Sequence, residues 1–327
     1  MGGIDRARHV PEHGTYLGDG AMLAMILSDS GVAQAAMLAR LAAARRSFER
    51  DRPAEMRLDI DKMFSQAYRL KLSTVLPPAE VAVMLAADNV RERALASARQ
   101  GDLAEAAVQL RQAAALCEDG GLSDHGRIAG LAFQRAAEAF ISYRRRRHDE
   151  ALRGLEDAII MCDHLTDVFG DAIEFRRIHF ARNALRVLCH SAPSERVVAD
   201  TIDLLYYTAG DEARWPLAVG QGLGKPALLS MAQRGWAIDE TIINLALPPV
   251  DIGAGRGFVP RVVHRHGFDR QLLAAFEWCD AMVALRTHDQ RSFARHAINF
   301  FEHRNYDLVQ AGRILDDAIE EAFAKPV

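Results

Sequence analysis

The stretch GDLAEAAVQLRQA, residues 101–113, has a partial copy in RHDEALRGLEDA, residues 147–158. Each stretch opens with a polar turn and continues into a Glu-Ala pair. A leucine follows four residues after that alanine, and a second alanine follows three residues after the leucine. Residues three and four apart share one face of a helix. Both stretches are therefore predicted to form a turn followed by a helix with a single packing face.

Helical spacing of apolar residues extends over nearly all of the 327-residue chain. Alternating β-branched runs are scarce, and short Gly, Pro, Ser or Asp breaks separate the helical segments. The sequence therefore predicts an all-α protein of stacked antiparallel helical hairpins with a C-terminal helical unit. The expected helices cover residues 53–74, 78–100, 102–117, 125–147, 149–163, 171–190, 194–209, 269–287, 289–303 and from 305 onward.

The two quoted stretches resemble the turn and second helix of a tetratricopeptide repeat. In that family the small alanine lets neighbouring helices approach closely, and Ala94 and Ala139 stand where the first helix carries a small residue. The copies are 45 residues apart, whereas that repeat is about 34 residues long. Arg93 and Glu138 also stand where the family has large apolar residues. The resemblance therefore covers about 90–209, and an ordinary helical bundle remains the alternative.

Composition divides the chain into four consecutive parts of one structural unit. Residues 1–89 are expected to cap the array as N-terminal helices, and 90–209 to form the repeat-like array. Residues 210–260 contain eight glycines and five prolines, with short helices expected near 226–234 and 238–247. Residues 261–327 are expected to form the C-terminal helices.

The resemblance implies an α-solenoid whose concave face binds a protein or a peptide. On that basis the chain is expected to be a non-enzymatic scaffold, adaptor or regulatory module, with no catalytic residue assigned. First-helix side chains would face the groove, and the expected partner-binding residues are Asp88, Arg91, Arg99, Phe140, Tyr143 and Arg144.

The sharpest local motif is PPVDIGAGRGF, residues 248–258, which is similar to the first motif of Rossmann-type S-adenosylmethionine methyltransferases. That loop requires a strand before it, and a Pro-Pro pair argues against a central strand. The segment 253–270 instead suggests an alternative, a helical enzyme or ligand-binding protein with an anion site. The residues expected in that site are Gly255, Arg256, Arg261, His264, Arg265 and His266.

A second alternative is a subunit of a nucleic-acid-associated assembly that uses the basic run Arg144–Arg147. The formal net charge of −4 disfavours this function, because binding to a phosphate backbone usually accompanies a basic excess. No metal-ligand spacing is present, and neither a metal nor a cofactor is expected. The four cysteines are widely spaced, and the N-terminus lacks an apolar signal segment. We therefore expect a cytoplasmic protein that makes no membrane contact.

Overall fold

The computed structural model describes residues 29–52, 59–221, 224, 226–247, 250–252 and 270–324. Within these ranges the chain forms twelve α-helices and three short 3-10 helices, with no β-strand. The α-helices are α2 (Asp29–Asp51), α3 (Ile60–Val75), α4 (Pro78–Gln100), α5 (Leu103–Asp119), α6 (Asp124–Arg144), α7 (His148–Phe169), α8 (Glu174–Leu188), α9 (Ser194–Thr208), α10 (Met231–Ile242), α11 (Arg270–Arg286), α12 (Gln290–Glu302) and α13 (Val309–Ala324).

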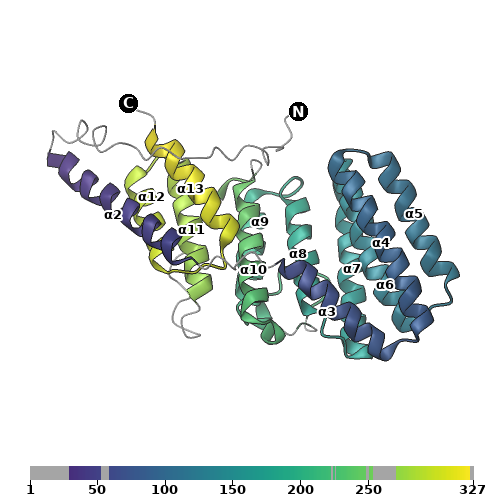
Figure 1. The fold of residues 1–327 in the computed structure, drawn as a ribbon. Coiled ribbons are helices and arrows are strands. Elements are labelled where there is room, and N and C mark those ends of the chain that lie inside the picture. Colours follow the sequence, from purple (N-terminus) through teal and green to yellow (C-terminus); the bar gives the residue numbers. More distant parts are fainter. Residues whose placement is uncertain are drawn as a thin grey trace.

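The helices are arranged as an elongated stack (Figure 1). α4, α5, α6 and α7 form one end, α8 to α10 form the middle, and α11 to α13 form the other end with α2. Consecutive helices pack against each other, with α4 on α5, α6 on α7 and α11 on α12. The prediction of an all-α fold built from stacked hairpins is confirmed.

Small side chains bring the hairpin helices together at the positions that the two quoted stretches share. Ala106 and Ala151 are fully buried, and so are Ala113 and Ala158 at the second alanine position. Leu110 and Leu155 lie between them and are almost completely buried. A buried alanine leaves room for a neighbouring backbone, whereas a buried leucine fills the space between helices.

Turn chemistry sets most helix boundaries close to the predicted ones. α4 begins at Pro78 and ends at Gly101, whose φ of 97° is left-handed. α7 extends to Phe169, six residues past its predicted end at 163, and stops at Gly170 with φ 65°. Left-handed backbone favours glycine, and both glycines therefore end their helices.

The helix predicted at 53–74 begins at Ile60. Asp59 caps it by accepting a hydrogen bond from the Lys62 backbone N–H at 2.9 Å. The first part of the predicted helix, 53–58, lies outside the described residues.

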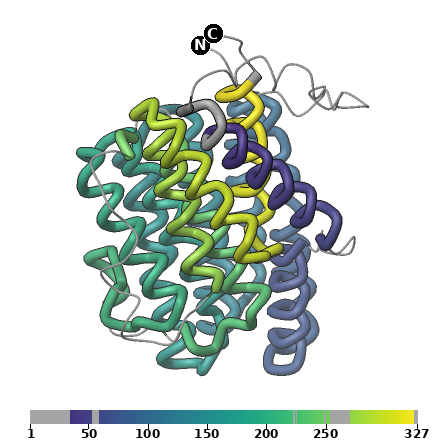
Figure 2. The backbone as a smooth tube through the Cα atoms, turned by 90° about the vertical axis from the view of Figure 1, so that its left-hand side faces the viewer, coloured from purple at the N-terminus to yellow at the C-terminus, as the bar shows by residue number. Residues whose placement is uncertain are grey.

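The described part of the expected N-terminal cap, 1–89, does not form a single unit. α2 packs on α12 at the far end of the stack (Figure 2). Phe48 lies 5.4 Å from the ring of Phe301 and 5.0 Å from that of Tyr306. This aromatic contact and the Arg40–Glu302 ion pair attach α2 to the C-terminal helices.

The described part of the glycine- and proline-rich section 210–260 contains one α-helix where two short ones were expected. α10 begins after Ser230, which forms a capping box with Gln233. The helix continues into a 3-10 turn, Ile243–Ala246, and two further 3-10 turns lie at Glu212–Arg214 and Pro226–Leu228. The capping box fixes the start of a single helix, and no break at 235–237 interrupts it.

Among the described residues, no helix has both the length and the apolar character that crossing a membrane requires.

Candidate functional site

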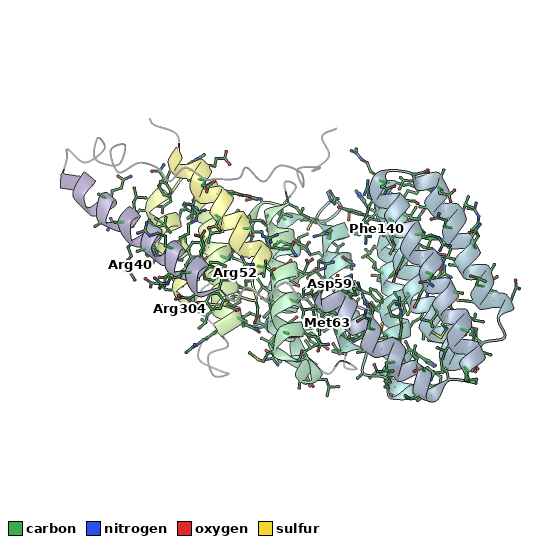
Figure 3. The ribbon with its side chains drawn as sticks, in the orientation of Figure 1. Arg40, Arg52, Asp59, Met63, Phe140 and Arg304 are labelled. Atoms are coloured by element: carbon green, nitrogen blue, oxygen red, sulfur yellow. The ribbon has the colours of Figure 1, made fainter. Side chains whose placement is uncertain are left out.

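A groove of about 810 Å³ lies between α3, α4, α6 and α8. α4 and α6 pack side by side as first helices of neighbouring hairpins, and α3 leads into α4 and packs against it. In Figure 3, Phe140 of α6 lies above the start of α3, where Asp59 and Met63 are located. A cavity of this size falls in the range that holds a ligand or a stretch of peptide.

One wall of the groove is α3, which packs against α4, α6 and α8. Its buried face carries Phe64, Tyr68 and Leu72, spaced four residues apart. The Tyr68 hydroxyl donates to a carboxylate oxygen of Asp171 at 2.7 Å, and Lys71 lies 3.1 Å from the other oxygen of that carboxylate. Ring contacts with α6 and α8 complete the packing. α3 therefore closes one side of the groove.

The structure brings five of the six expected partner-binding residues into this groove. Its lining includes Asp88, Arg91, Arg99, Phe140 and Tyr143. Arg144 does not line the cavity, and its guanidinium carbon lies 6.0 Å from the centre of the Phe140 ring.

Part of the groove is a network of paired charges. Arg69 of α3 donates to Asp88 at 3.0 Å and to Glu92 at 2.9 Å, both on α4. Arg91 pairs with Asp88 as well and donates to the Gly130 carbonyl at 3.3 Å. These contacts join α3, α4 and α6 through groups that are already satisfied within the chain.

The α8 side of the groove carries arginines that are buried or half-buried. Arg176 pairs with Asp61 at 2.7 Å, and Arg182 pairs with Glu240 of α10. Burial, together with the nearby Arg186 guanidinium, lowers the pKa of Arg182 to about 9. Burial also lowers the pKa of Arg186 below its ordinary value. Buried cations of this kind favour the arrival of a negative charge.

Arg186 is the cation of this group without a carboxylate partner among the described residues. Its Nε donates to the side-chain oxygen of Asn244 at 3.1 Å. The groove also contains the half-buried imidazole of His179, stacked on the Trp236 ring at 5.4 Å between centres. Burial lowers the pKa of His179 well below 6.5, and the nearby positive charge of Arg182 lowers it further.

Sequence reasoning missed the whole α8 contribution to the groove. A detectable signal was present, because polar residues recur three or four positions apart within a segment already expected to be helical. The groove residues of α8 that were missed include Arg176, His179, Arg182, Asn183 and Arg186.

The other expected site residues lie elsewhere or cannot be placed. The anion-site residues, Gly255, Arg256, Arg261, His264, Arg265 and His266, lie outside the described residues. The basic run Arg144–Arg147 is exposed, and α6 ends at its first member.

Half of that basic run already has partners within the chain. Arg145 donates to the Leu103 carbonyl at 2.9 Å, and Arg147 pairs with Glu150 at 3.5 Å. Arg146, with φ 60°, forms the turn between α6 and α7.

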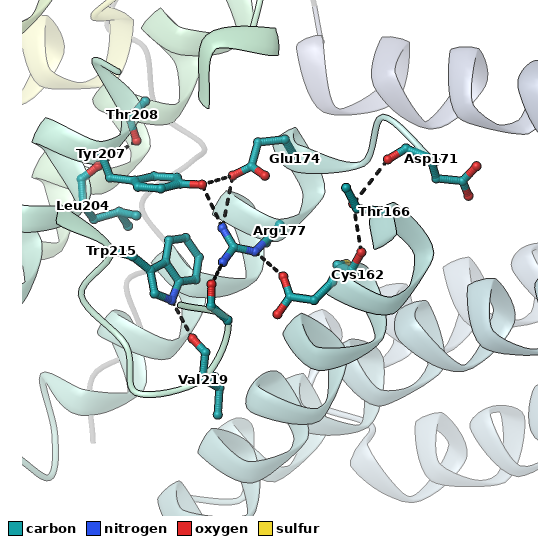
Figure 4. Close-up of polar contacts among 12 residues, drawn as sticks. Cys162, Thr166, Asp171, Glu174, Arg177, Leu204, Tyr207, Thr208, Trp215 and Val219 are labelled. Carbon is teal, nitrogen blue, oxygen red and sulfur yellow. Dashed lines mark hydrogen bonds and ion pairs between the residues drawn. The ribbon is translucent and has the colours of Figure 1, made fainter. Parts of the chain in front are cut away.

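A second polar cluster surrounds Arg177 and is closed to solvent (Figure 4). The guanidinium donates to Asp163 at 2.6 Å, to the Tyr207 hydroxyl at 2.8 Å and to the Gly220 carbonyl. It also stacks on Trp215 with 3.6 Å from its carbon to the ring centre. With 1% of the Arg177 side chain exposed, this cluster joins α7, α8 and α9 to residues 215–220 rather than receiving a ligand.

Nucleophilic and metal-ligating groups do not gather in the groove. The four cysteines are buried, and burial raises the pKa of Cys189 to about 11. Among the described residues no group of three or more His, Cys, Asp or Glu side chains is placed to hold a metal ion. The groove therefore offers guanidinium donors, amide groups and aromatic faces.

Comparisons with protein-family models, with curated proteins and with solved structures gave no match to this chain.

Proposed function

We propose that this chain is a non-enzymatic, tetratricopeptide-like module of the cytoplasm, a scaffold or adaptor that binds a segment of a protein partner in the groove between α3, α4, α6 and α8. The observation that supports the proposal is the convergence of side chains from four helices on a single cavity of about 810 Å³. Stacked hairpins commonly use their concave face for such binding.

The chemistry of the lining supports peptide binding. Phe140 and Tyr143 offer half-buried aromatic faces, and Leu95 adds an apolar contact beside them. Arginine and aromatic side chains are the residue types that dominate binding energy at protein interfaces. The cavity offers both in one place, together with amide and guanidinium donors for a peptide backbone.

Site-specific cross-linking in cells that express the full chain tests this proposal. A photoreactive phenylalanine derivative replaces Phe140 in the groove, and the matched control replaces Ile160, an exposed residue of α7 that does not line the cavity. We expect one partner polypeptide to be cross-linked from Phe140 and not from Ile160. Equal cross-linking from both positions, or none from Phe140, would contradict the proposal.

A further inference from the structure

Basic side chains outnumber acidic ones in the lining of the groove. Its lining contains seven Lys and Arg residues against four acidic ones. All four acids are already used by the chain itself. Asp59 caps α3, Asp61 pairs with Arg176, and Asp88 and Glu92 pair with Arg69. Arg91 also pairs with Asp88, and Arg182 pairs with Glu240 of α10. Among the described residues, the lining cations that form no ion pair are Lys62, Arg99 and Arg186.

The direction of the helices places Arg99 and Arg186 on the same side of the groove. α4, α6 and α8 are separated by one antiparallel helix each, and they therefore run in the same direction. Their last turns therefore lie along the same edge of the stack. Each of these last turns carries an arginine: Arg99, Arg144 and Arg186. We use the name "basic end" for the groove residues Arg99, Phe140, Tyr143 and Arg186, which all line the cavity.

The cations of the basic end are free to meet a ligand. Within the described residues neither Arg99 nor Arg186 forms an ion pair, and the one hydrogen bond of the Arg186 side chain goes to the neutral Asn244. Arg186 is half-buried and lines the cavity together with Tyr143. A half-buried guanidinium without a counter-charge gains a charge-assisted hydrogen bond when a carboxylate arrives.

From this charge pattern we infer that the basic end binds an acidic segment of a partner protein, with a Glu or Asp carboxylate on Arg186, a second on Arg99 and an apolar side chain between Phe140 and Tyr143. This inference rests on the proposed function and specifies the partner's chemistry. The acids elsewhere in the groove, together with the net charge of −4, disfavour a nucleic acid, whose phosphates would meet Asp88 and Glu92 as well.

Fluorescence anisotropy with the purified full chain tests the inference. Three labelled peptides share the same Leu and Phe residues and alternate them with Glu, with Gln or with Lys; labelled oligouridylate is a fourth probe. We expect the Glu peptide to bind about tenfold more tightly than the Gln peptide and to weaken as salt is added. The Lys peptide and the oligouridylate should bind more weakly than the Glu peptide.

Matched variants locate the effect on the groove. R186Q and R99Q should each reduce the Glu-peptide preference by about threefold to tenfold. R111Q removes an exposed arginine of α5 outside the groove and should change nothing. Because R186Q also loses the Asn244 contact, R186K and the exposed R99Q keep the test independent of folding.

Each result decides between the two proposals. Equal binding of Glu and Gln peptides that is lost in F140A would overturn the acidic-partner inference and leave the peptide-binding function standing. Tighter binding of the Lys peptide or of the oligouridylate would also overturn the inference. If no peptide binds, both proposals fail.

Discussion

Gly154 of α7 lies directly against Ala139 of α6: a Cβ placed on Gly154 would be 3.1 Å from the Cβ of Ala139. The same Cβ would lie 3.3 Å from the Arg135 carbonyl oxygen. These distances are shorter than ordinary van der Waals contact. The close packing of α6 on α7 therefore depends on the absence of a Cβ at Gly154.

Replacement of Gly154 tests that close contact. We expect Gly154→Val to lower the free energy of unfolding by about 1–3 kcal/mol, because the added carbons must push α6 and α7 apart. The matched control is Gly312→Ala on α13, where the nearest atoms to an added Cβ lie 3.9 Å away. That control should be neutral or raise stability by about 0.5–1 kcal/mol, since alanine is the better helix former. Urea unfolding measures both, and a stability of Gly154→Val equal to wild type would show that the contact does not limit the packing.

Local patterns were sufficient to predict most of the helices. Apolar spacing located α3 to α9 and α11 to α13, and Gly101 marked the end of α4, whereas α10 replaces two expected short helices and α7 runs past its predicted end. Five groove residues on α4 and α6 followed from the repeat-like pattern, because side chains on first helices share a direction.

Long-range contacts lay beyond those patterns. The position of α3 depends on Tyr68 reaching Asp171, 103 residues away, and no local spacing encodes that contact. The packing of α2 on α12 through Phe48 is likewise a long-range contact that local spacing does not encode. The groove arginines of α8 were missed, because that helix is buried on most sides and its spacing alone does not show which of its faces meets the groove.

The buried guanidinium of Arg177 provides a second prediction. It lies beside the carboxylates of Asp163 and Glu174 and beneath the Trp215 ring. We expect Arg177→Met to lower the free energy of unfolding by about 3 kcal/mol or more, because removal of one partner leaves buried carboxylates without a counter-charge.

Two further variants separate the charge effect from the loss of packing. Arg111→Met, at an exposed site on α5, should stay within about 0.5 kcal/mol of wild type. The double variant Arg177→Met with Asp163→Asn should recover part of the loss, as it removes one unpaired carboxylate. If the double variant were no more stable than Arg177→Met, the loss would be due to packing around Trp215 rather than to charge.

The groove histidine gives a prediction for pH. His179 faces Arg176, Arg182 and Arg186 on its own helix, Trp236 on α10 and Asp61 on α3, whose carboxylate lies 3.5 Å from its Nδ1. Burial and then these three arginines lower its pKa well below 6.5, so the folded protein keeps this imidazole neutral.

The sign follows from proton binding in the two states. Below about pH 6.5 the unfolded chain binds a proton at His179, whereas the folded chain does not. The free energy of unfolding therefore falls as pH decreases. We expect this group to account for a loss of up to about 1.4 kcal/mol per pH unit between pH 7 and 5. In His179→Gln that contribution disappears, so the stability gap between wild type and variant should be wider at pH 7 than at pH 5. Urea unfolding at both pH values measures the gap, and an NMR titration follows the imidazole directly. A gap that widened toward pH 5 would mean that Asp61 outweighs the arginines and that the folded groove holds a protonated histidine.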